Sequence, residues 1–380
     1  MTGVKRKICS IILLVMFATV VLATLSACNL SDLKNGISIH KDGVYYTVYV
    51  LKRYAVAHGF DKNISGSVYE IPSRVKYKAI RYPVRELSPS GDTNYKLVRD
   101  NGVVTELIVP ETMAELKLSR YAYAELENLQ KITVNTANST YMSVDGVVYS
   151  KDLSTLVFYP SAKVGNNLVL PKQTSSINDY LSGKKNLSTI EVEEGNTSYS
   201  AKDGVLFTAD GKEMLCYPLN KKDSTYVIPQ SCTVLNTFRL DANAHLKYLE
   251  VEEGNTVFAT FQGDLYSHNY SILLYRPHGN NMEVLELAEN ITTVGLGMLD
   301  KVKYLYVPSG LERIVFETSN RYEDVNVSNP IADVAHVYFE SSELPIFLRY
   351  TNFTGSVQFG VTREQFQADV EALQSAGEQL

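Results

Sequence analysis

The stretch Asn196-Thr-Ser-Tyr-Ser-Ala-Lys-Asp-Gly-Val-Leu-Phe-Thr-Ala-Asp-Gly-Lys-Glu-Met-Leu-Cys-Tyr-Pro218 decides the fold, because related copies lie on both sides of it. Three markers within it recur before and after it with one shared period of about 58 residues. A single period shared by three markers indicates stacked repeats rather than separate globular domains. The markers are Asn138-Ser-Thr-Tyr141, Asn196-Thr-Ser-Tyr199 and Asn255-Thr-Val-Phe258; Asp145-Gly146 to Tyr149, Asp203-Gly204 to Phe207 and Gly263 to Tyr266; and Tyr159-Pro160, Tyr217-Pro218 and Arg276-Pro277.

Each repeat predicts short strands. Leu168-Val-Leu-Pro171 indicates a strand that ends at Pro, which cannot donate a hydrogen bond to a ladder. About 22 residues later, 189–193 alternates apolar and polar residues, so Ile190 and Val192 are predicted to point inward. Asp210-Gly211 stands between two apolar runs, 204–207 and 214–217, and predicts a hairpin.

The step of about 22 residues lies within the period of 20–29 that leucine-rich repeats have. The order of an Ile-Pro strand, a turn-rich segment, "L..I.V...N..Y...DG.LY" and "L..YP" resembles the BspA-type leucine-rich repeats of bacterial surface proteins. Residues 168–277 match closely, 107–167 well and 284–310 with losses, whereas 311–334 is degenerate. The resemblance implies a mostly β leucine-rich repeat solenoid with β-hairpin insertions.

The ends of the chain are predicted to close this array, since stacked repeats need caps. Asp42 to Tyr46 and Gly66 to Pro72 look like the entry module of the same family. Near the other end, Thr362 and Gln365 resemble a capping box, and Phe366, Val370 and Leu373 share one helical face. The predicted domains are a signal peptide 1–27, a tether 28–36, a β-rich N-terminal cap module 37–105, the solenoid 106–335, and a C-terminal cap 336–380 with a helix at 362–376.

The N-terminal residues have the pattern of a secretory signal. Lys5, Arg6 and Lys7 precede an apolar run at 8–22, and small residues follow it. Leu25-Ser-Ala-Cys28 resembles the lipobox of bacterial lipoproteins, which implies cleavage before Cys28 and a lipid on its sulfur. The alternative is an uncleaved membrane helix at 8–27. Either reading places the rest of the chain outside the cytoplasm.

The net charge limits the classes of binding partner, and the cysteines offer one candidate disulfide. The chain has 36 Lys and Arg against 42 Asp and Glu, and loss of the signal brings the net charge near −9. Such a surface is expected to repel nucleic acid and anionic lipid, and nothing in the sequence looks like a basic footprint. After Cys28, only Cys216 and Cys232 remain, so a disulfide is conceivable. Cys216 stands where sister repeats have Phe158 and Tyr275, which favours a core role instead.

Catalytic patterns are missing from the sequence. It has no Gly-x-Ser-x-Gly, His-Glu-x-x-His, phosphate loop or dinucleotide glycine motif, so we predict no enzyme activity and no cofactor. His268 and His278 flank a predicted hairpin but lack a third metal ligand. The acidic pairs at 193–194 and 252–253 could belong to a glycosidase or a calcium loop. Their equivalent places in successive repeats favour a role in the repeat itself.

Strand alternation predicts an outward face beside the inward stack of Ile132, Ile190, Leu249 and Leu305 and of Val134, Val192, Val251 and Val307. Tyrosine supplies rigid contact area with a polar tip, which suits protein or sugar partners. The alternative is that these are ordinary exposed strand residues. The candidate partner-binding residues are Thr189, Glu191, Glu193, Tyr248, Glu250, Glu252, Tyr304 and Tyr306.

These patterns together favour a non-enzymatic, monomeric lipoprotein at the cell surface. It would be held to the membrane through Cys28, and its resemblance to BspA-type proteins implies that it binds a host or bacterial surface protein or a glycan. An envelope scaffold protein is the second hypothesis, and a hydrolase of surface glycans is the third. A repeat scaffold does not by itself identify its ligand.

Overall fold

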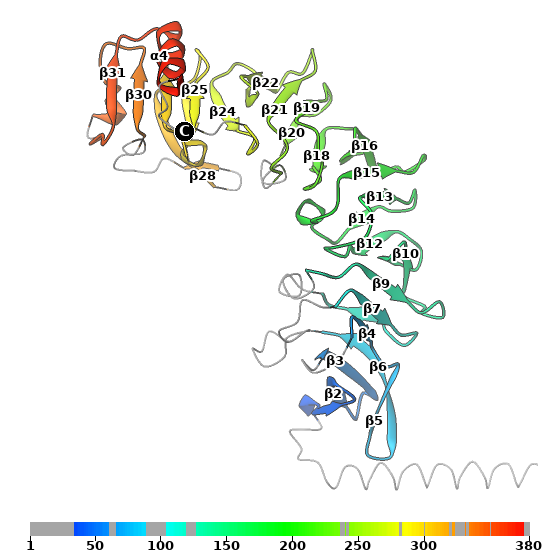
Figure 1. Ribbon diagram of the computed structural model, residues 1–380. Coiled ribbons are helices and arrows are strands. Elements are labelled where there is room, and N and C mark those ends of the chain that lie inside the picture. The colour runs from blue at the N-terminus through cyan, green and yellow to red at the C-terminus, as the bar shows by residue number, and fades with distance from the viewer. Residues whose placement is uncertain are drawn as a thin grey trace, which may run out of the picture. The chain divides into compact units, whose positions relative to one another are not determined.

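The computed structural model describes residues 34–60, 66–88, 104–118, 127–235, 240, 243–280, 283–299, 301–318, 321–323, 331, 334–349 and 351–375. The predicted signal peptide and Cys28 lie outside these residues. The chain divides into two compact units. Unit 1 comprises residues 1–165, 173–180 and 184–186, and unit 2 comprises 166–172, 181–183 and 187–380. Both are built mainly from short strands (Figure 1).

Unit 1 begins with a mixed sheet in the order β1-β2-β3-β6-β5, with β8 also paired to β6. Asp42 and Gly43 form the two-residue turn between β1 and β2, and both have positive φ angles, of 51° and 77°. An Asp-Gly pair tolerates this conformation and matches the twist of the two strands. The bounds are β1 Ile37–Lys41, β2 Val44–Tyr49, β3 Tyr54–Phe60, β5 Arg74–Tyr77, β6 Ile80–Leu87 and β8 Glu115–Leu116.

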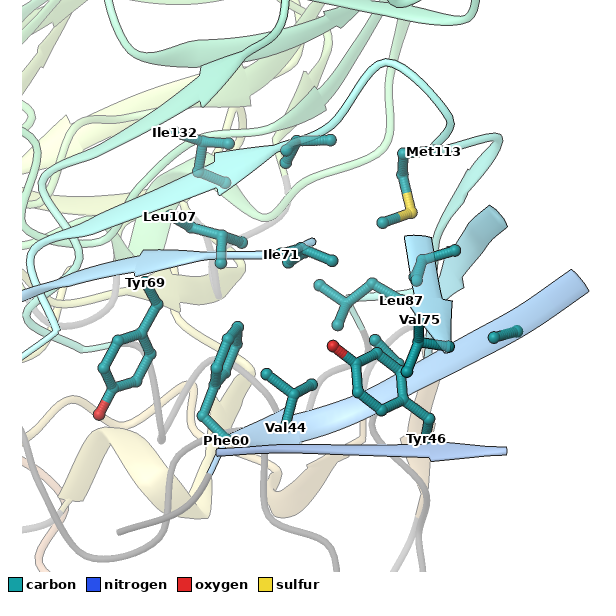
Figure 2. Packing of buried hydrophobic residues seen from close by; sticks show 14 of the residues in the cluster. Val44, Tyr46, Phe60, Tyr69, Ile71, Val75, Leu87, Leu107, Met113 and Ile132 are labelled. Atoms are coloured by element: carbon teal, nitrogen blue, oxygen red, sulfur yellow. The ribbon is translucent and has the colours of Figure 1, made fainter. Parts of the chain in front are cut away.

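A parallel ladder follows in unit 1, made of β4 Val68–Glu70, β7 Glu106–Val109 and β9 Lys131–Val134. It already begins inside the segment predicted as the N-terminal cap. Figure 2 shows Val44 and Phe60 of the mixed sheet pointing toward the inward residues of this ladder. Tyr69, Leu107 and Ile132 of the ladder are at most 2% exposed. One core therefore joins the N-terminal sheet to the first coils.

The predicted hairpin insertion is present and is larger than expected. In unit 1 it is the antiparallel meander β10-β11-β12, whose last strand pairs in parallel with β14. The strand that follows the Asn marker was not predicted as a strand. Asp145-Gly146 forms its tight turn, again with positive φ at both residues. The bounds are β10 Tyr141–Val144, β11 Val147–Ser150, β12 Thr155–Phe158 and β14 Ser176–Ile177.

Unit 2 repeats the same plan. The ladder strands are β13 Asn167–Leu170, β15 Thr189–Val192, β19 Thr225–Ile228, β21 Tyr248–Val251, β25 Val284–Glu286, β27 Tyr304–Val307, β30 His336–Phe339 and β31 Ser356–Phe359. β13 pairs in parallel with β15, β19 with β21, and β25-β27-β30-β31 form one parallel sheet. Each step from one ladder strand to the next is thus one coil of a solenoid, as predicted.

The returns of unit 2 form two further sheets, β16-β17-β18-β20 and β22-β23-β24-β26-β28-β29. Short 3-10 turns lie in the connections between strands, at η1 Leu181–Gly183, η3 Leu296–Leu299 and η4 Ile346–Leu348. β28 and β29 form an excursion in the stretch that the sequence showed as degenerate. The bounds are β16 Tyr199–Lys202, β17 Val205–Thr208, β18 Glu213–Cys216, β20 Val234–Leu235, β22 Phe258–Phe261, β23 Asp264–Ser267, β24 Ile272–Tyr275, β26 Thr293–Gly295, β28 Arg313–Thr318 and β29 Arg321–Glu323.

The inward residues are those that alternation predicted. Ile190, Leu249 and Leu305 are at most 1% exposed. Val192 and Val251 are only half-buried, whereas the equivalent Val134 and Val307 are at most 6% exposed. Cys216 and Cys232 are both buried free thiols, in agreement with a core role for Cys216.

Buried asparagines connect neighbouring coils and explain the first sequence marker. The Asn255 amide donates to the carbonyl oxygens of Pro229 and Cys232, at 3.0 and 2.8 Å. Its side-chain oxygen accepts from the backbone amides of Val257 and Phe258, both at 2.9 Å. Asn138 makes the same four contacts in unit 1. One side chain thereby satisfies four backbone groups that a turn leaves without partners.

The third repeat replaces two core residues by an ion pair. Asp264 and Arg276 stand where the second repeat has Val205 and Tyr217, and both charged side chains are almost fully buried. Arg276 Nε lies 3.2 Å from Asp264 Oδ2, and the guanidinium also donates to the carbonyls of Val284 and Met298. Burial of a charge is tolerated when it is paired and hydrogen-bonded in this way.

The titration of Asp264 gives a test of this burial. Loss of water raises the pKa of Asp264 to about 6, although Arg276 and Asn280 favour the charged form. Because this pKa lies above the usual 3.8, the contribution of Asp264 to stability is complete below about pH 4 and is lost as the pH rises through about 6. We expect the free energy of unfolding of the natural chain, relative to Asp264→Asn, to fall over that interval in denaturant titrations. A constant difference across the interval would contradict this prediction.

The predicted C-terminal helix is α4 Arg363–Ser375. Its capping box is present, since the Thr362 amide donates to Gln365 Oε1 at 2.8 Å and the Gln365 amide donates to Thr362 Oγ1 at 3.3 Å. Phe366 and Val370 are buried and Leu373 packs beside them. The predicted end of the helix at residue 376 lies just outside the described residues. The helix lies on the outward side of β27 and β30 (Figure 1).

Candidate partner-binding face

In unit 2, hairpin turns lie against the open edges of the strand pairs β13-β15 and β19-β21. The backbone amide of Ile190 in β15 donates to the carbonyl of Gly204, at 2.9 Å. On the other side of that turn, Lys221 Nζ donates to the carbonyl of Asp203, at 2.7 Å. The Leu249 amide likewise donates to the Gly263 carbonyl, at 2.8 Å. Each turn therefore takes the place of a strand at the open edge of a pair.

The residues that face outward on β13, β15, β19 and β21 are given by the register. Asn167 lies opposite Thr189, and Thr225 lies opposite Tyr248. The next outward row places Val169 opposite Glu191 and Val227 opposite Glu250. Glu191 and Glu250 are exposed, Thr189 is half-buried and Tyr248 is 47% exposed. We name these eight residues the outward face.

Tyr248 is held in place by the turn beside it. A Cβ atom on Gly263 would lie 2.5 Å from the Tyr248 ring, so only glycine leaves space for that ring. Gly263 also has a φ of +84°, which other residues rarely adopt. Thr189 and Gly204 have the same relation in the previous repeat, with a closest approach of 3.2 Å. The glycine of the second sequence marker thus supports the side chain at the centre of the face.

Two acidic residues of the predicted face have a structural task. Glu193 Oε2 accepts the Lys172 amide at 2.9 Å, and Glu252 Oε2 accepts the Gln230 amide at 2.8 Å. Both amides directly follow the proline that ends the preceding strand. Lys202 also pairs with Glu252, and these contacts hold the pKa of that carboxyl below its usual range. A role in the repeat, the alternative considered for these acidic positions, matches the geometry.

Two tyrosines of the predicted face are not exposed. Tyr304 is 3% and Tyr306 is 1% exposed, so the expectation that they line an open surface is wrong. Phe366 of α4 packs on Tyr306, with ring centroids 5.4 Å apart, and Tyr304 belongs to the same buried cluster. Arg363 lies over the Tyr306 ring at 5.2 Å and pairs with Glu286. Alternation predicted their outward direction correctly, but α4 packs on this side of the strands, so the exposed face ends at β25.

Two apolar residues of the face were missed. Val169 is 45% and Val227 is 37% exposed. Each valine comes directly after the first inward-facing residue of its strand. The sequence did contain the information. In Leu168-Val-Leu170 and Tyr226-Val-Ile228 the valine stands between two inward-facing residues, and alternation therefore points it outward. With Tyr248 they give the acidic face an apolar component, which favours contact with a partner.

The outward face carries groups that can form hydrogen bonds or pack against another molecule. It offers carboxylates, a phenol, hydroxyl groups and exposed valines. Nowhere in the described part of the chain do three His, Cys, Asp or Glu side chains gather closely enough to hold a metal ion. Among the described residues, no helix is both long and apolar enough to cross a membrane.

Parallel strands one coil apart, inward apolar stacks and buried asparagines that join neighbouring coils are now established for both units. The fold is a leucine-rich repeat solenoid. It is mostly β, with β-hairpin insertions and a short C-terminal helix, as predicted. No protein-family model matches the chain, and no curated protein does either.

Several solved structures resemble this leucine-rich repeat chain at low identity. One is the pneumococcal vaccine antigen PcpA, at 16% identity over 86% of this chain and 99% of that one, with a TM-score of 0.43. A leucine-rich cell surface protein from Faecalibacterium prausnitzii is 16% identical over 87% and 97%, with a TM-score of 0.38. A leucine-rich repeat protein from Bacteroides ovatus is 14% identical over 86% and 68%, with a TM-score of 0.27.

Proposed function

We propose that this chain is a non-enzymatic surface lipoprotein that binds a protein or glycan partner through the outward face of unit 2. The observation that carries the proposal is the exposed mixture of Tyr248, Val227 and Glu250 on adjacent paired strands. Aromatic and apolar side chains held rigid by backbone lose little entropy on binding. Neighbouring carboxylates add selectivity for partners with complementary donors.

Export and anchoring form the second part of the proposal. The positive head, apolar run and Leu25-Ser-Ala-Cys28 motif support cleavage before Cys28 and lipidation of its sulfur. Two acyl chains on one residue give stable membrane attachment. The solenoid would then present its face at the cell surface, on a tether of residues 28–36. Protease treatment of intact cells tests this placement, because a surface protein is degraded while a protein enclosed in the envelope is protected.

Removal of the central side chains tests the face. In a pull-down from host and bacterial extracts paired with a glycan array, we expect residues 29–380 to retain a partner. Tyr248→Ala combined with Glu250→Ala is expected to weaken that binding about tenfold or more, as central aromatic contacts do. Thermal unfolding should change little, because Glu250 is exposed and Tyr248 is 47% exposed.

The matched control is Tyr180→Ala combined with Glu253→Ala. Tyr180 is 59% exposed and Glu253 is exposed, but neither belongs to the outward face. The control is expected to bind like the natural chain. Binding that persists unchanged in the Tyr248 and Glu250 variant would exclude this face as the contact surface.

A further inference from the structure

The charges of the chain are strongly segregated. The chain as a whole carries six more acidic than basic residues. The described residues of the N-terminal sheet region, 34–60 and 66–88, have the opposite balance, with nine basic and three acidic residues. A local excess of this size forms its own field, which the net charge of the chain conceals. The basic residues are Lys34, Lys41, Lys52, Arg53, Arg74, Lys76, Lys78, Arg81 and Arg85.

Part of this charge forms a strip on the β5–β6 hairpin. Lys76 lies directly opposite Arg81, and Arg74 lies opposite Pro83 on the same side of the hairpin. Arg74, Lys76, Arg81 and Arg85 are all exposed, and in the described part of the chain no ion pair neutralises them. Like charges that face each other across paired strands repel. A surface that supplies several negative charges at once relieves that repulsion.

The strip and the entry of the chain lie at one end of the sheet. Ile37, where β1 begins, pairs with Val48 near the end of β2, and the β2–β3 turn follows at once. β3 runs parallel to β6, with Ala55 opposite Val84, so the β5–β6 turn lies at the same end. Figure 1 shows β5 and β6 extending past β2 and β3. We name this region the entry end, defined by residues 49–54 and 74–81.

The β2–β3 turn adds an apolar tip to the entry end. Leu51 is 61% exposed and is followed by Lys52 and Arg53. Tyr49 and Tyr54 stack at a centroid distance of 5.3 Å, and Lys52 lies over the Tyr49 ring. Tyrosine, lysine and arginine around an exposed leucine are the residue types that lie at a membrane surface.

We propose that the entry end docks on the anionic surface of the bilayer that holds the lipid. This inference rests on the proposed anchor at Cys28. Between Cys28 and Ile37 the chain can span at most about 30 Å, so the anchor would keep the entry end near the headgroups. Phospholipid phosphates would neutralise Arg74, Lys76 and Arg81, while Leu51 would enter the interface. The acidic outward face of unit 2 carries no such charge and stays available for a partner.

Vesicle binding of the mature chain with Cys28→Ser, which carries no lipid, tests the proposal. We expect saturable binding to phosphatidylcholine vesicles that contain phosphatidylglycerol, little binding to phosphatidylcholine alone, and release by salt. Lys76→Glu with Arg81→Glu should lower binding on the order of tenfold or more. The matched control is Lys172→Glu with Lys247→Glu, because both lysines are exposed and lie outside the entry end. Equal loss in both double variants would overturn the proposal.

A single fluorophore locates the contact. The chain contains no Trp, so Leu51→Trp introduces one reporter at the apolar tip, and Val227→Trp places the matched reporter on unit 2. With phosphatidylglycerol vesicles, we expect a blue shift for Leu51→Trp and none for Val227→Trp. A chain that binds soluble polyphosphate but not vesicles would show that the partner is a polyanion, against our proposal. Failure of the anchor itself is separate: salt would then release the natural chain from cell membranes as readily as it releases the Cys28→Ser variant.

Discussion

Asp264→Val is expected to lower the free energy of unfolding by about 3–5 kcal/mol, because it leaves the Arg276 guanidinium buried without a counter-charge. Arg276→Tyr is expected to cost a similar amount by stranding the carboxylate. The double variant Asp264→Val, Arg276→Tyr installs the pair that the second repeat has at 205 and 217. It should unfold within about 2 kcal/mol of the natural chain, the remainder reflecting the lost bonds to two carbonyls.

Denaturant unfolding of the four proteins completes a double-mutant cycle that isolates the coupling of the two residues. A large positive coupling is the expected result, because the damage of either change is repaired by the other. Asp264→Asn serves as the isosteric control at constant volume. The double variant could instead lose as much free energy of unfolding as the two single variants lose together. The two repeats would then not be interchangeable at this position, and the alignment of their cores would be wrong.

Asn255→Ala is expected to cost about 2–4 kcal/mol, because buried backbone groups that lose their partners retain the full cost of dehydration. The substitution removes the partners of the Pro229 and Cys232 carbonyls and of the Val257 and Phe258 amides, and the side chain is 3% exposed. Thermal and denaturant unfolding measure the loss.

The matched control for this prediction is Asn135→Ala. Asn135 is exposed, and its side-chain oxygen accepts only the nearby Ala137 amide among the contacts of the described residues. Its replacement should cost about 0.5 kcal/mol or less, as surface substitutions usually do. Equal stability losses for the two variants would show that the buried asparagine does not stabilise the junction between coils.

Much of the fold could be predicted because its signals are local and occur in three copies. Alternation around Ile190 and Leu249 identified the inward stack, and Asp210-Gly211 identified the hairpin between β17 and β18. The helix was predictable from the spacing of Phe366 and Val370 and from its capping box. The repeat of Asn255 was visible, but its role was not, because the carbonyls it holds belong to Pro229 and Cys232, in the preceding coil.

The candidate site was predicted in part only. Parity tells which side of a strand a residue faces, and it placed Tyr248 and Glu250 correctly on the outside. It says nothing about what covers that side, so Tyr306 was taken as exposed although α4, much later in the chain, packs on it. Averaging charge over the chain had a similar effect: it concealed the basic strip around Lys76 and Arg81.

The central claim is that the successive repeats stack as interchangeable units, and removal of one repeat tests it most directly. Deletion of 168–225 joins Asn167 to Tyr226 and so passes from the first position of β13 to the second position of β19. We predict a folded chain that keeps its β circular dichroism per residue and unfolds cooperatively, whereas deletion of only 168–196 disrupts folding. Equal disruption by both deletions would contradict the claim.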